Sequence, residues 1–306
     1  MDKEGQIVAD LITVRDWWRW ATSCMSRASL CFGQGTQNAR DEAAWILLET
    51  LHLPPDDLSP WLEARLTQAE RWQVVQKIRR RLQTRMPAAY LLGRAWLAGL
   101  SFRVSPDVII PRSGLAHKIS EQLVPWLDSP GQVRHALDMC SGSGCLAILI
   151  AHHFEQAHVD ALDISPAALH IAGLNVKEHG LEGRIRLLEG DLFANEQLRM
   201  DYDLIVCNPP YVAHSSMQQL PPEFQYEPEL ALAGGEDGLD IVRQILHVAA
   251  NYMSNHGLLV IEIGHHRAAV EAELGAHWPL TWMESEEGAG DILMLRQKDL
   301  QRITGA

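Results

Sequence analysis

The residues best suited to chemistry follow a short apolar run in the second half of the chain. Leu204 to Cys207 lead directly into Asn208, Pro209, Pro210 and Tyr211. The run predicts a buried strand of a parallel sheet, and the prolines end it in a stiff extended segment. The Asn208 side-chain oxygen and the Pro209 carbonyl are two acceptors, which suit a planar NH2 group, and Tyr211 can pack on that group. We therefore predict a clamp for a planar amino group; the alternative is a strand followed by a proline-rich turn without chemistry.

Acidic residues stand at the ends of three other predicted strands, at Asp138, Asp163 and Asp191. Gly142-Ser143-Gly144 lies between the first two, where glycines let a ligand approach the backbone closely. The chain lacks the third glycine of the dinucleotide fingerprint and the lysine of a phosphate loop, which disfavours both kinds of ligand. Carboxylates suit a ligand with hydroxyls, amines and a positive charge, such as S-adenosylmethionine. We expect Asp163 to bind its ribose and Asp191 its adenine amino group.

The composition is that of a globular protein with an acidic surface. The 306 residues are 47% hydrophobic and carry a formal net charge of −13. This charge disfavours general affinity for nucleic-acid phosphates and is compatible with a basic protein partner. We expect no direct binding of DNA.

Other features predict a cytoplasmic protein without a metal site. Five cysteines form no Cys-x-x-Cys pair, and Met1 to Asp10 has no signal-peptide core. The longest strongly apolar run, Cys145 to Ala151, is too short to span a bilayer. His152-His153 and His265-His266 have no carboxylate or cysteine at ligand spacing, so we expect exposed helix residues there.

Periodicity predicts a helical N-terminal part followed by alternating strands and helices. Thr13 and Thr67 are predicted to begin helices, a third helix is expected over 38–51, and Trp17, Trp18, Trp20 and Trp45 are expected to anchor the core. A hairpin is expected over 96–111, with its turn at 105–107. The predicted later elements are strands at 136–140, 159–164, 185–188, 203–207 and 257–263, a helix over 237–253, and an antiparallel pair at 280–284 and 291–295. The repeated strand–helix units predict a parallel sheet covered on both faces.

These motifs together resemble the protein-glutamine methyltransferases, which modify the side-chain amide of a glutamine in translation proteins. The resemblance covers nearly the whole chain. The segments that carry it are Asp138–Cys145, Leu162–Leu169, Asn208–Tyr211, Glu227–Leu230 and Gly234–Leu239. Phe32–Thr36 and Ile110–Ser113 favour the branch that methylates large-subunit ribosomal protein L-three. The chain departs from that branch at Gly114, where a proline is usual, and at His117, where a glutamate is usual.

The resemblance implies a fold, a domain organisation and a partner. The fold is that of a class I S-adenosylmethionine-dependent methyltransferase, an α/β Rossmann-like fold with a mostly parallel seven-stranded sheet. A helical substrate-recognition domain (1–86) and a linker with a β-hairpin (87–114) precede the catalytic domain (115–306). The cofactor is S-adenosylmethionine, with S-adenosylhomocysteine as product, and no metal is expected. The implied protein substrate is ribosomal protein L-three, modified before or during ribosome assembly.

The resemblance also implies the site residues. Those implied in catalysis are Asn208, Pro209 and Tyr211. Those implied in cofactor binding are Asp138, Cys140, Gly142, Gly144, Asp163, Ile164, Asp191, Leu192 and Asn208. Those implied in substrate binding are Asn208, Pro209, Pro210, Tyr211, Arg112 and Glu227.

Three other functions remain as alternatives. One is glutamine methylation of peptide chain release factors, whose enzymes usually have Pro-Arg-Pro where this chain has Pro111-Arg112-Ser113. Another is adenine-amino methylation of nucleic acid, which shares the clamp but is disfavoured by the acidic charge. The last is a non-catalytic S-adenosylmethionine-binding factor of ribosome assembly, against which the intact Asn208–Tyr211 segment argues.

Overall fold

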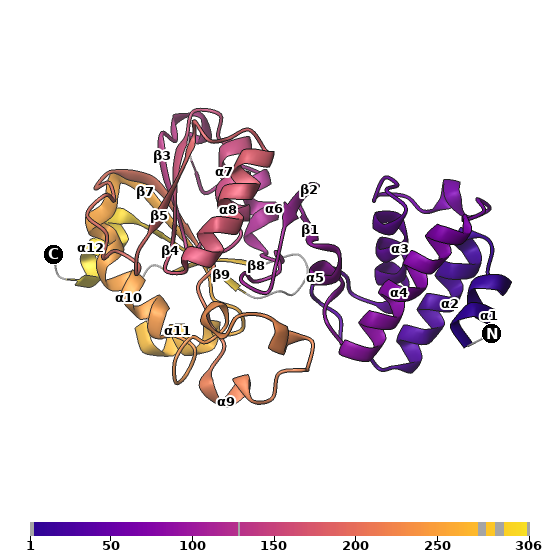
Figure 1. The fold of residues 1–306 in the computed structure, drawn as a ribbon. Coiled ribbons are helices and arrows are strands. Elements are labelled where there is room, and N and C mark those ends of the chain that lie inside the picture. The colour runs from indigo at the N-terminus through magenta and orange to yellow at the C-terminus, as the bar shows by residue number, and fades with distance from the viewer. Residues whose placement is uncertain (1–2, 128, 275–279, 285–290, 305–306) are drawn as a thin grey trace. The chain divides into compact units, whose positions relative to one another are not determined.

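The structure, a computed structural model, describes residues 3–127, 129–274, 280–284 and 291–304. The chain divides into two compact units (Figure 1). Unit 1 comprises Met1–Ala95 together with Leu220–Tyr226, and unit 2 comprises Trp96–Gln219 together with Glu227–Ala306. The helical domain predicted from sequence, residues 1–86, ends earlier than unit 1 does. It also lacks the distant segment Leu220–Tyr226, which belongs to unit 1.

Unit 1 is helical. Its elements are α1 (Lys3–Asp10), α2 (Val14–Arg27), α3 (Ala39–Thr50), η1 (Ser59–Trp61), α4 (Gln68–Thr84), α5 (Ala88–Leu92) and η3 (Phe224–Tyr226). Capping boxes at Thr13 and Thr67 begin α2 and α4, as predicted, because each threonine side chain and the acidic residue three positions later satisfy free N–H groups. Trp17 and Trp45 are buried in the core, whereas Trp18 and Trp20 are only half-buried, each beneath an arginine side chain.

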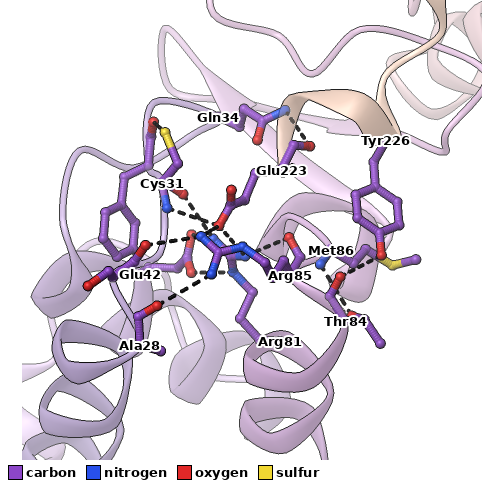
Figure 2. A network of polar contacts seen from close by, with 12 residues as sticks. Ala28, Cys31, Gln34, Glu42, Arg81, Thr84, Arg85, Met86, Glu223 and Tyr226 are labelled. Carbon is purple, nitrogen blue, oxygen red and sulfur yellow. Dashed lines mark hydrogen bonds and ion pairs between the residues drawn. The ribbon is translucent and has the colours of Figure 1, made fainter. Parts of the chain in front are cut away.

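A buried network of charges joins the segment Leu220–Tyr226 to the helices of unit 1 (Figure 2). Arg81 Nε lies 2.7 Å from Glu42 Oε1, and Arg85 Nη2 lies 2.7 Å from Glu223 Oε1. The Cys31 N–H donates to the same Glu223 oxygen over 2.9 Å. Burial raises the pKa of Glu42, while the Arg81 guanidinium opposes that rise. Because Glu223 is fully buried, the segment that contains it is an integral part of the unit 1 core.

Unit 2 contains a seven-stranded sheet in the order β5-β4-β3-β6-β7-β9-β8, which confirms the predicted sheet. Its strands are β3 (His135–Met139), β4 (His158–Asp163), β5 (Ile185–Glu189), β6 (Tyr202–Cys207), β7 (Met253–Glu262), β8 (Thr281–Glu284) and β9 (Asp291–Arg296). All neighbours pair in parallel from β5 to β7, whereas β9 runs antiparallel to both β7 and β8.

Helices cover both faces of this sheet (Figure 1). The helices of unit 2 are α6 (Leu115–Ser120), η2 (Pro130–Gln132), α7 (Cys145–His153), α8 (Pro166–Glu178), α9 (His214–Met217), η4 (Glu229–Ala231), α10 (Asp240–Val248), η5 (Ala249–Tyr252), α11 (Arg267–Leu274) and α12 (Gln297–Thr304). Along β6, Leu204 and Val206 pack in the cluster that contains α6, α7 and α8. Ile205 and Cys207 pack in the cluster that contains α10, α11 and α12. This alternation makes β6 apolar on both sides, as expected of a central parallel strand.

The prediction of a hairpin over 96–111 is wrong in its bounds and in the position of its turn. The hairpin consists of β1 (Arg94–Leu97) and β2 (Leu100–Arg103), and its turn at Ala98 and Gly99 has positive φ angles of 47° and 78°. Residues 108–111 form no strand, because the Ile110 N–H donates to the Glu227 carboxylate over 3.0 Å instead of to a neighbouring strand.

Two further differences concern the C-terminal part of unit 2. The helix predicted over 237–253 is α10 followed by η5, and β7 begins already at Met253. Among the helices that the structure describes, none is both long enough and apolar enough to cross a membrane.

Candidate active site

A cavity of about 930 Å³, which includes its open mouth, lies at the carboxyl ends of the parallel strands of unit 2. The chain runs from β3 outward to β4 and β5, and then returns to the other side of β3 with β6, so the strand order reverses beside β3. Ligands of open α/β sheets bind at such a reversal. Seven residues predicted to bind cofactor line the cavity: Cys140, Gly142, Asp163, Ile164, Asp191, Leu192 and Asn208.

Asp163 stands at the end of β4 and fixes the glycine loop. One carboxylate oxygen accepts from the Gly142 N–H over 2.8 Å, and the other accepts from the Ser165 N–H over 2.9 Å. Gly142 has a φ of +55°, a conformation that a side chain disfavours. Burial raises the pKa of Asp163, while these two N–H groups lower it. The carboxylate is thus held at the cavity wall by backbone donors and keeps lone pairs for a ligand.

Asp138 and Gly144 are not among the residues that line the cavity, so the structure gives them a supporting place. Asp138 is fully buried, and its Oδ2 accepts from the Ser141 hydroxyl over 2.6 Å and from the Ala147 N–H over 3.0 Å. Burial raises the pKa of Asp138 to about 7. Gly144 precedes α7 with a φ of +76°, and a Cβ there would lie 3.1 Å from the Ala172 Cβ. Asp138 and Gly144 therefore support the conformation of the glycine loop at 141–144 without lining the cavity.

The cavity has strained backbone and apolar walls. Cys140 and Leu192 adopt positive φ angles of 58° and 49°, a region of backbone conformation that non-glycine residues adopt rarely. Ile164 and Leu230 are 47% and 56% exposed although both are large and apolar, and both line the cavity. Apolar side chains exposed at a cavity wall suit a ligand with a flat apolar part.

The Asn208–Tyr211 segment leaves the sheet at the edge of this cavity. Asn208 and Pro210 line the cavity, and both prolines are buried. Within the part of the chain that the structure describes, neither the Asn208 side-chain amide nor the Pro209 carbonyl has a hydrogen-bond partner. A side chain that merely closed a turn would bond to a backbone group nearby. The Asn208 amide, which lines the cavity, is therefore available for a bound molecule, whereas Pro209 and Tyr211 are not among the lining residues.

Glycines and a histidine hold the segment that follows. A Cβ at Gly234 would lie 2.7 Å from both the Pro210 carbonyl oxygen and the Tyr211 Cα, so only glycine permits this approach. Val212 donates to the Leu232 carbonyl over 2.8 Å. His266 Nε2 lies 2.8 Å from the Tyr211 carbonyl oxygen. The prediction that His266 is an exposed helix residue is wrong, because it precedes α11 and is half-buried.

Arg112 and Glu227 bind each other. The Arg112 guanidinium contacts both carboxylate oxygens of Glu227, and its Nη2 lies 2.8 Å from Oε2. Glu227 is 5% exposed and also receives the Ile110 N–H, so it braces the segment before α6. Neither Arg112 nor Glu227 is among the residues that line the cavity. Contact of these two residues with substrate stays a prediction.

The departures at Gly114 and His117 lie at the start of α6. Gly114 has a φ of −64°, which is the angle that proline would impose. His117 is exposed on α6, with Nδ1 3.5 Å from Glu121 Oε1. The φ angle at position 114 is therefore compatible with the proline that is usual in the related branch.

Known proteins match nearly the whole chain. Residues 116–223 match the "Methyltransferase small domain" family and residues 16–93 match the "PrmC N-terminal domain" family. A relative from Bordetella pertussis, named ribosomal protein uL3 glutamine methyltransferase, is 50% identical over 292 residues and covers 95% of this chain and 97% of its own. Relatives of the same name from Neisseria meningitidis serogroup A and Bradyrhizobium diazoefficiens are 48% and 42% identical, over 97% and 95% of this chain and 97% and 92% of their own.

A solved structure confirms the fold. The hMettl16 catalytic domain in complex with MAT2A 3'UTR hairpin 6 matches with a TM-score of 0.52 and 17% identity, over 74% of this chain and 81% of that chain. At this identity the likeness concerns the fold alone. Together with the methyltransferase domain family, it confirms the predicted class I methyltransferase fold.

Proposed function

This chain belongs to the ribosomal protein uL3 glutamine methyltransferases, and from that premise we propose that it methylates the side-chain amide nitrogen of a glutamine in uL3. The methyl donor is S-adenosylmethionine, and S-adenosylhomocysteine is the product. The observation that carries the proposal is a pair of acceptors, the Asn208 amide oxygen and the Pro209 carbonyl, which have no hydrogen-bond partner among the described residues; Asn208 lines a cavity that the Asp163 and Asp191 carboxylates also line.

The cavity suits the cofactor in the chemistry of its lining residues. The Asp163 carboxylate would accept hydrogen bonds from the ribose hydroxyls, and Asp191 from the adenine amino group, while Ile164 and Leu192 would flank the adenine ring. Acidic groups at the wall also favour a cationic sulfonium over a phosphate ligand. When bound, S-adenosylmethionine supplies an electrophilic methyl group.

The clamp addresses the main difficulty of the reaction, the weakness of an amide nitrogen as nucleophile. Its lone pair is delocalised into the carbonyl, so positive charge develops on the NH2 group as it attacks. The Asn208 oxygen and the Pro209 carbonyl would accept from that NH2 group and stabilise the charge. Holding the nitrogen in line with the methyl group supplies the orientation. Tyr211 would stack on the amide plane, and the proton can leave after transfer, so no strong general base is needed.

The partner is recognised in the cytoplasm, before or during ribosome assembly. The net charge of −13 fits a basic protein such as one that binds ribosomal RNA. The helical residues 1–86 are assigned to substrate recognition, and DNA is not a partner. A photo-crosslinking residue at Arg80, which is exposed on α4, should give crosslinks to uL3. Crosslinks that map only outside unit 1, with probes in both units, would contradict this assignment.

The experiment that tests the function uses tritiated S-adenosylmethionine, this protein and a lysate from cells that lack it. We expect one major labelled protein, identified by mass spectrometry as uL3 with one methylated glutamine. Label in a release factor would instead place the enzyme with the release-factor branch. Label in nucleic acid, or no label with cofactor binding intact, would contradict the proposal.

A further inference from the structure

A histidine beyond the end of β7 bonds to the Asn208–Tyr211 segment, which carries the clamp. β6 and β7 pair in parallel, and Cys207, the last residue of β6, is the register partner of Ile261. His266 follows a few residues later, and its Nε2 lies 2.8 Å from the Tyr211 carbonyl oxygen. A carbonyl oxygen can only accept a hydrogen bond, so Nε2 carries the ring proton and donates.

The stretch that carries His266 is held by two other elements of unit 2. The Ile263 N–H donates to the Asp291 carbonyl over 3.0 Å, and the Asp291 N–H, at the start of β9, donates to the Gly264 carbonyl over 2.7 Å. The Val270 N–H, in α11, donates to the His266 carbonyl over 3.0 Å. Hydrogen bonds to β9 and α11 therefore fix the backbone from which the His266 ring reaches Tyr211.

Two glycines leave the space that this contact needs. A Cβ at Gly238 would collide with the Tyr211 carbonyl oxygen and would lie 2.8 Å from His266 Nε2, so a side chain there would disrupt the hydrogen bond. A Cβ at Gly264 would lie 2.8 Å from Tyr211 Cε2. Both glycines have positive φ angles, 88° and 58°, which a side chain disfavours. The carbonyl and the ring of Tyr211 therefore pack closely against backbone that only glycine provides.

The hydrogen bond from His266 supplies an anchor that the prolines of the segment cannot supply. Proline has no N–H group, so neither of the two can donate a backbone hydrogen bond. On one side of the clamp, pairing of β6 with its neighbours holds Cys207. On the other side, His266 holds the Tyr211 carbonyl. The two acceptors of the clamp, on Asn208 and Pro209, thus lie between two held points of the backbone.

We infer that His266 is a positioning residue for glutamine methylation, which holds the Tyr211 carbonyl and thereby the direction of the clamp acceptors. The inference rests on the proposed clamp. Acceptors that are oriented before the reaction stabilise developing charge without reorganising as the charge appears. A clamp segment that is free at one end would lose part of this advantage, and the acceptor nitrogen would be held less well in line with the methyl group. His266 should therefore affect turnover and not cofactor affinity.

The test compares three substitutions of His266 in methylation of purified uL3. His266→Gln keeps a donor, because the glutamine Nε2 reaches about as far as the imidazole Nε2. His266→Asn carries its N–H group closer to the backbone, and His266→Leu keeps bulk without a donor. We expect kcat to fall about tenfold in the asparagine and leucine variants, the scale of one lost hydrogen bond, and to stay within about threefold of wild type in His266→Gln. Calorimetric cofactor affinity should stay unchanged in all three.

A spectroscopic measurement follows Tyr211 without relying on activity. In protein labelled with 3-fluorotyrosine, the Tyr211 resonance is the one that disappears in Tyr211→Phe. This resonance should shift in His266→Leu, because the ring next to Gly264 moves when the carbonyl is released. It should return toward its wild-type position in His266→Gln.

His179→Leu is the matched control. His179 is also half-buried, and its Nε2 lies 3.0 Å from the Ser101 carbonyl oxygen, but neither residue is among those that line the cavity. This variant should lower the thermal midpoint and leave kcat per folded molecule unchanged. If His266→Leu behaves like His179→Leu, with an unmoved Tyr211 resonance, His266 is structural only.

Two other outcomes also decide the matter. Equal loss of turnover in His266→Gln and His266→Leu would overturn the inference, because the donor would then make no difference. If His266→Leu does not fold, the comparison of His266→Asn with His266→Gln takes its place. Failure of the clamp itself is distinguished by Asn208→Ala: normal turnover there removes the clamp, whereas reduced turnover there with normal turnover in His266→Leu removes only the role of His266.

Discussion

Asp138→Asn should change how the stability of unit 2 depends on pH. Asp138 is fully buried beneath the glycine loop, and its pKa is raised from 3.8 to about 7. In the part of the chain that the structure describes, its Oδ1 has no hydrogen-bond partner, which explains why burial dominates. Asparagine matches the shape of the neutral acid, and its single oxygen can accept from both the Ser141 hydroxyl and the Ala147 N–H.

Whether the free energy of unfolding rises or falls with pH depends on which state, folded or unfolded, binds the proton at Asp138. Between pH 4 and 7 the folded protein binds a proton at Asp138 that the unfolded chain has lost, so the free energy of unfolding falls as pH rises. This contribution to the free energy of unfolding is fully present below the pKa of Asp138 in the unfolded chain. It is lost above the pKa of Asp138 in the folded protein. The full difference is about 4 kcal/mol, of which about 1.4 kcal/mol falls between pH 6 and 8.

Urea unfolding followed by circular dichroism at pH 6, 7 and 8 measures the free energy of unfolding. These pH values lie above the isoelectric point near 5.5. Relative to wild type, Asp138→Asn should gain about 1.4 kcal/mol from pH 6 to pH 8. Ser141→Ala removes a donor that lowers the pKa of Asp138, so it should move the fall in stability to higher pH. Identical pH dependence in wild type and Asp138→Asn would show that Asp138 does not titrate in this range.

Two further predictions concern the cofactor and unit 1. Asp163→Ala should weaken S-adenosylmethionine binding by about 1–3 kcal/mol in calorimetry, because a charged acceptor is lost at the cavity wall; unchanged affinity with an intact fold would remove Asp163 from the site. Glu223→Ala should destabilise unit 1 by about 1–3 kcal/mol, because it leaves the Cys31 N–H and the Arg85 guanidinium without their buried acceptor, while Arg81 keeps Glu42. A loss below about 1 kcal/mol in urea unfolding, the scale of an exposed ion pair, would contradict this role.

The sequence predicts the strands that surround the cavity well because its signals are local. The apolar run before Asn208 fixes a strand, and the carboxylates Asp163 and Asp191 mark strand ends, which parallel pairing must bring to one edge. The capping boxes at Thr13 and Thr67 are equally local, since each involves residues three positions apart.

What the sequence missed depends on contacts between distant residues. Ile110 looks like a strand residue, but its N–H bonds to Glu227, 117 positions away. Glu223 looks like a loop residue and is buried among arginines more than a hundred positions earlier. The position of His266 depends on the Tyr211 carbonyl that it contacts, 55 positions earlier. One signal was available in the sequence: the glycines of Gly234–Leu239 indicate a close backbone approach, but not to which segment.

Turnover of Asn208→Ala tests the central claim, that a clamp for a planar amide performs the chemistry. The hydrogen bond that Asn208 accepts should strengthen as the amide nitrogen becomes positive, so its loss should reduce kcat more than it weakens binding. We expect turnover on uL3 to fall roughly a hundredfold or more, the scale of removing one preorganised charge-stabilising group. The thermal midpoint and the calorimetric cofactor affinity of the same sample should change little. Normal turnover per folded molecule, with a lowered thermal midpoint, would contradict the clamp and leave Asn208 as a residue of the turn.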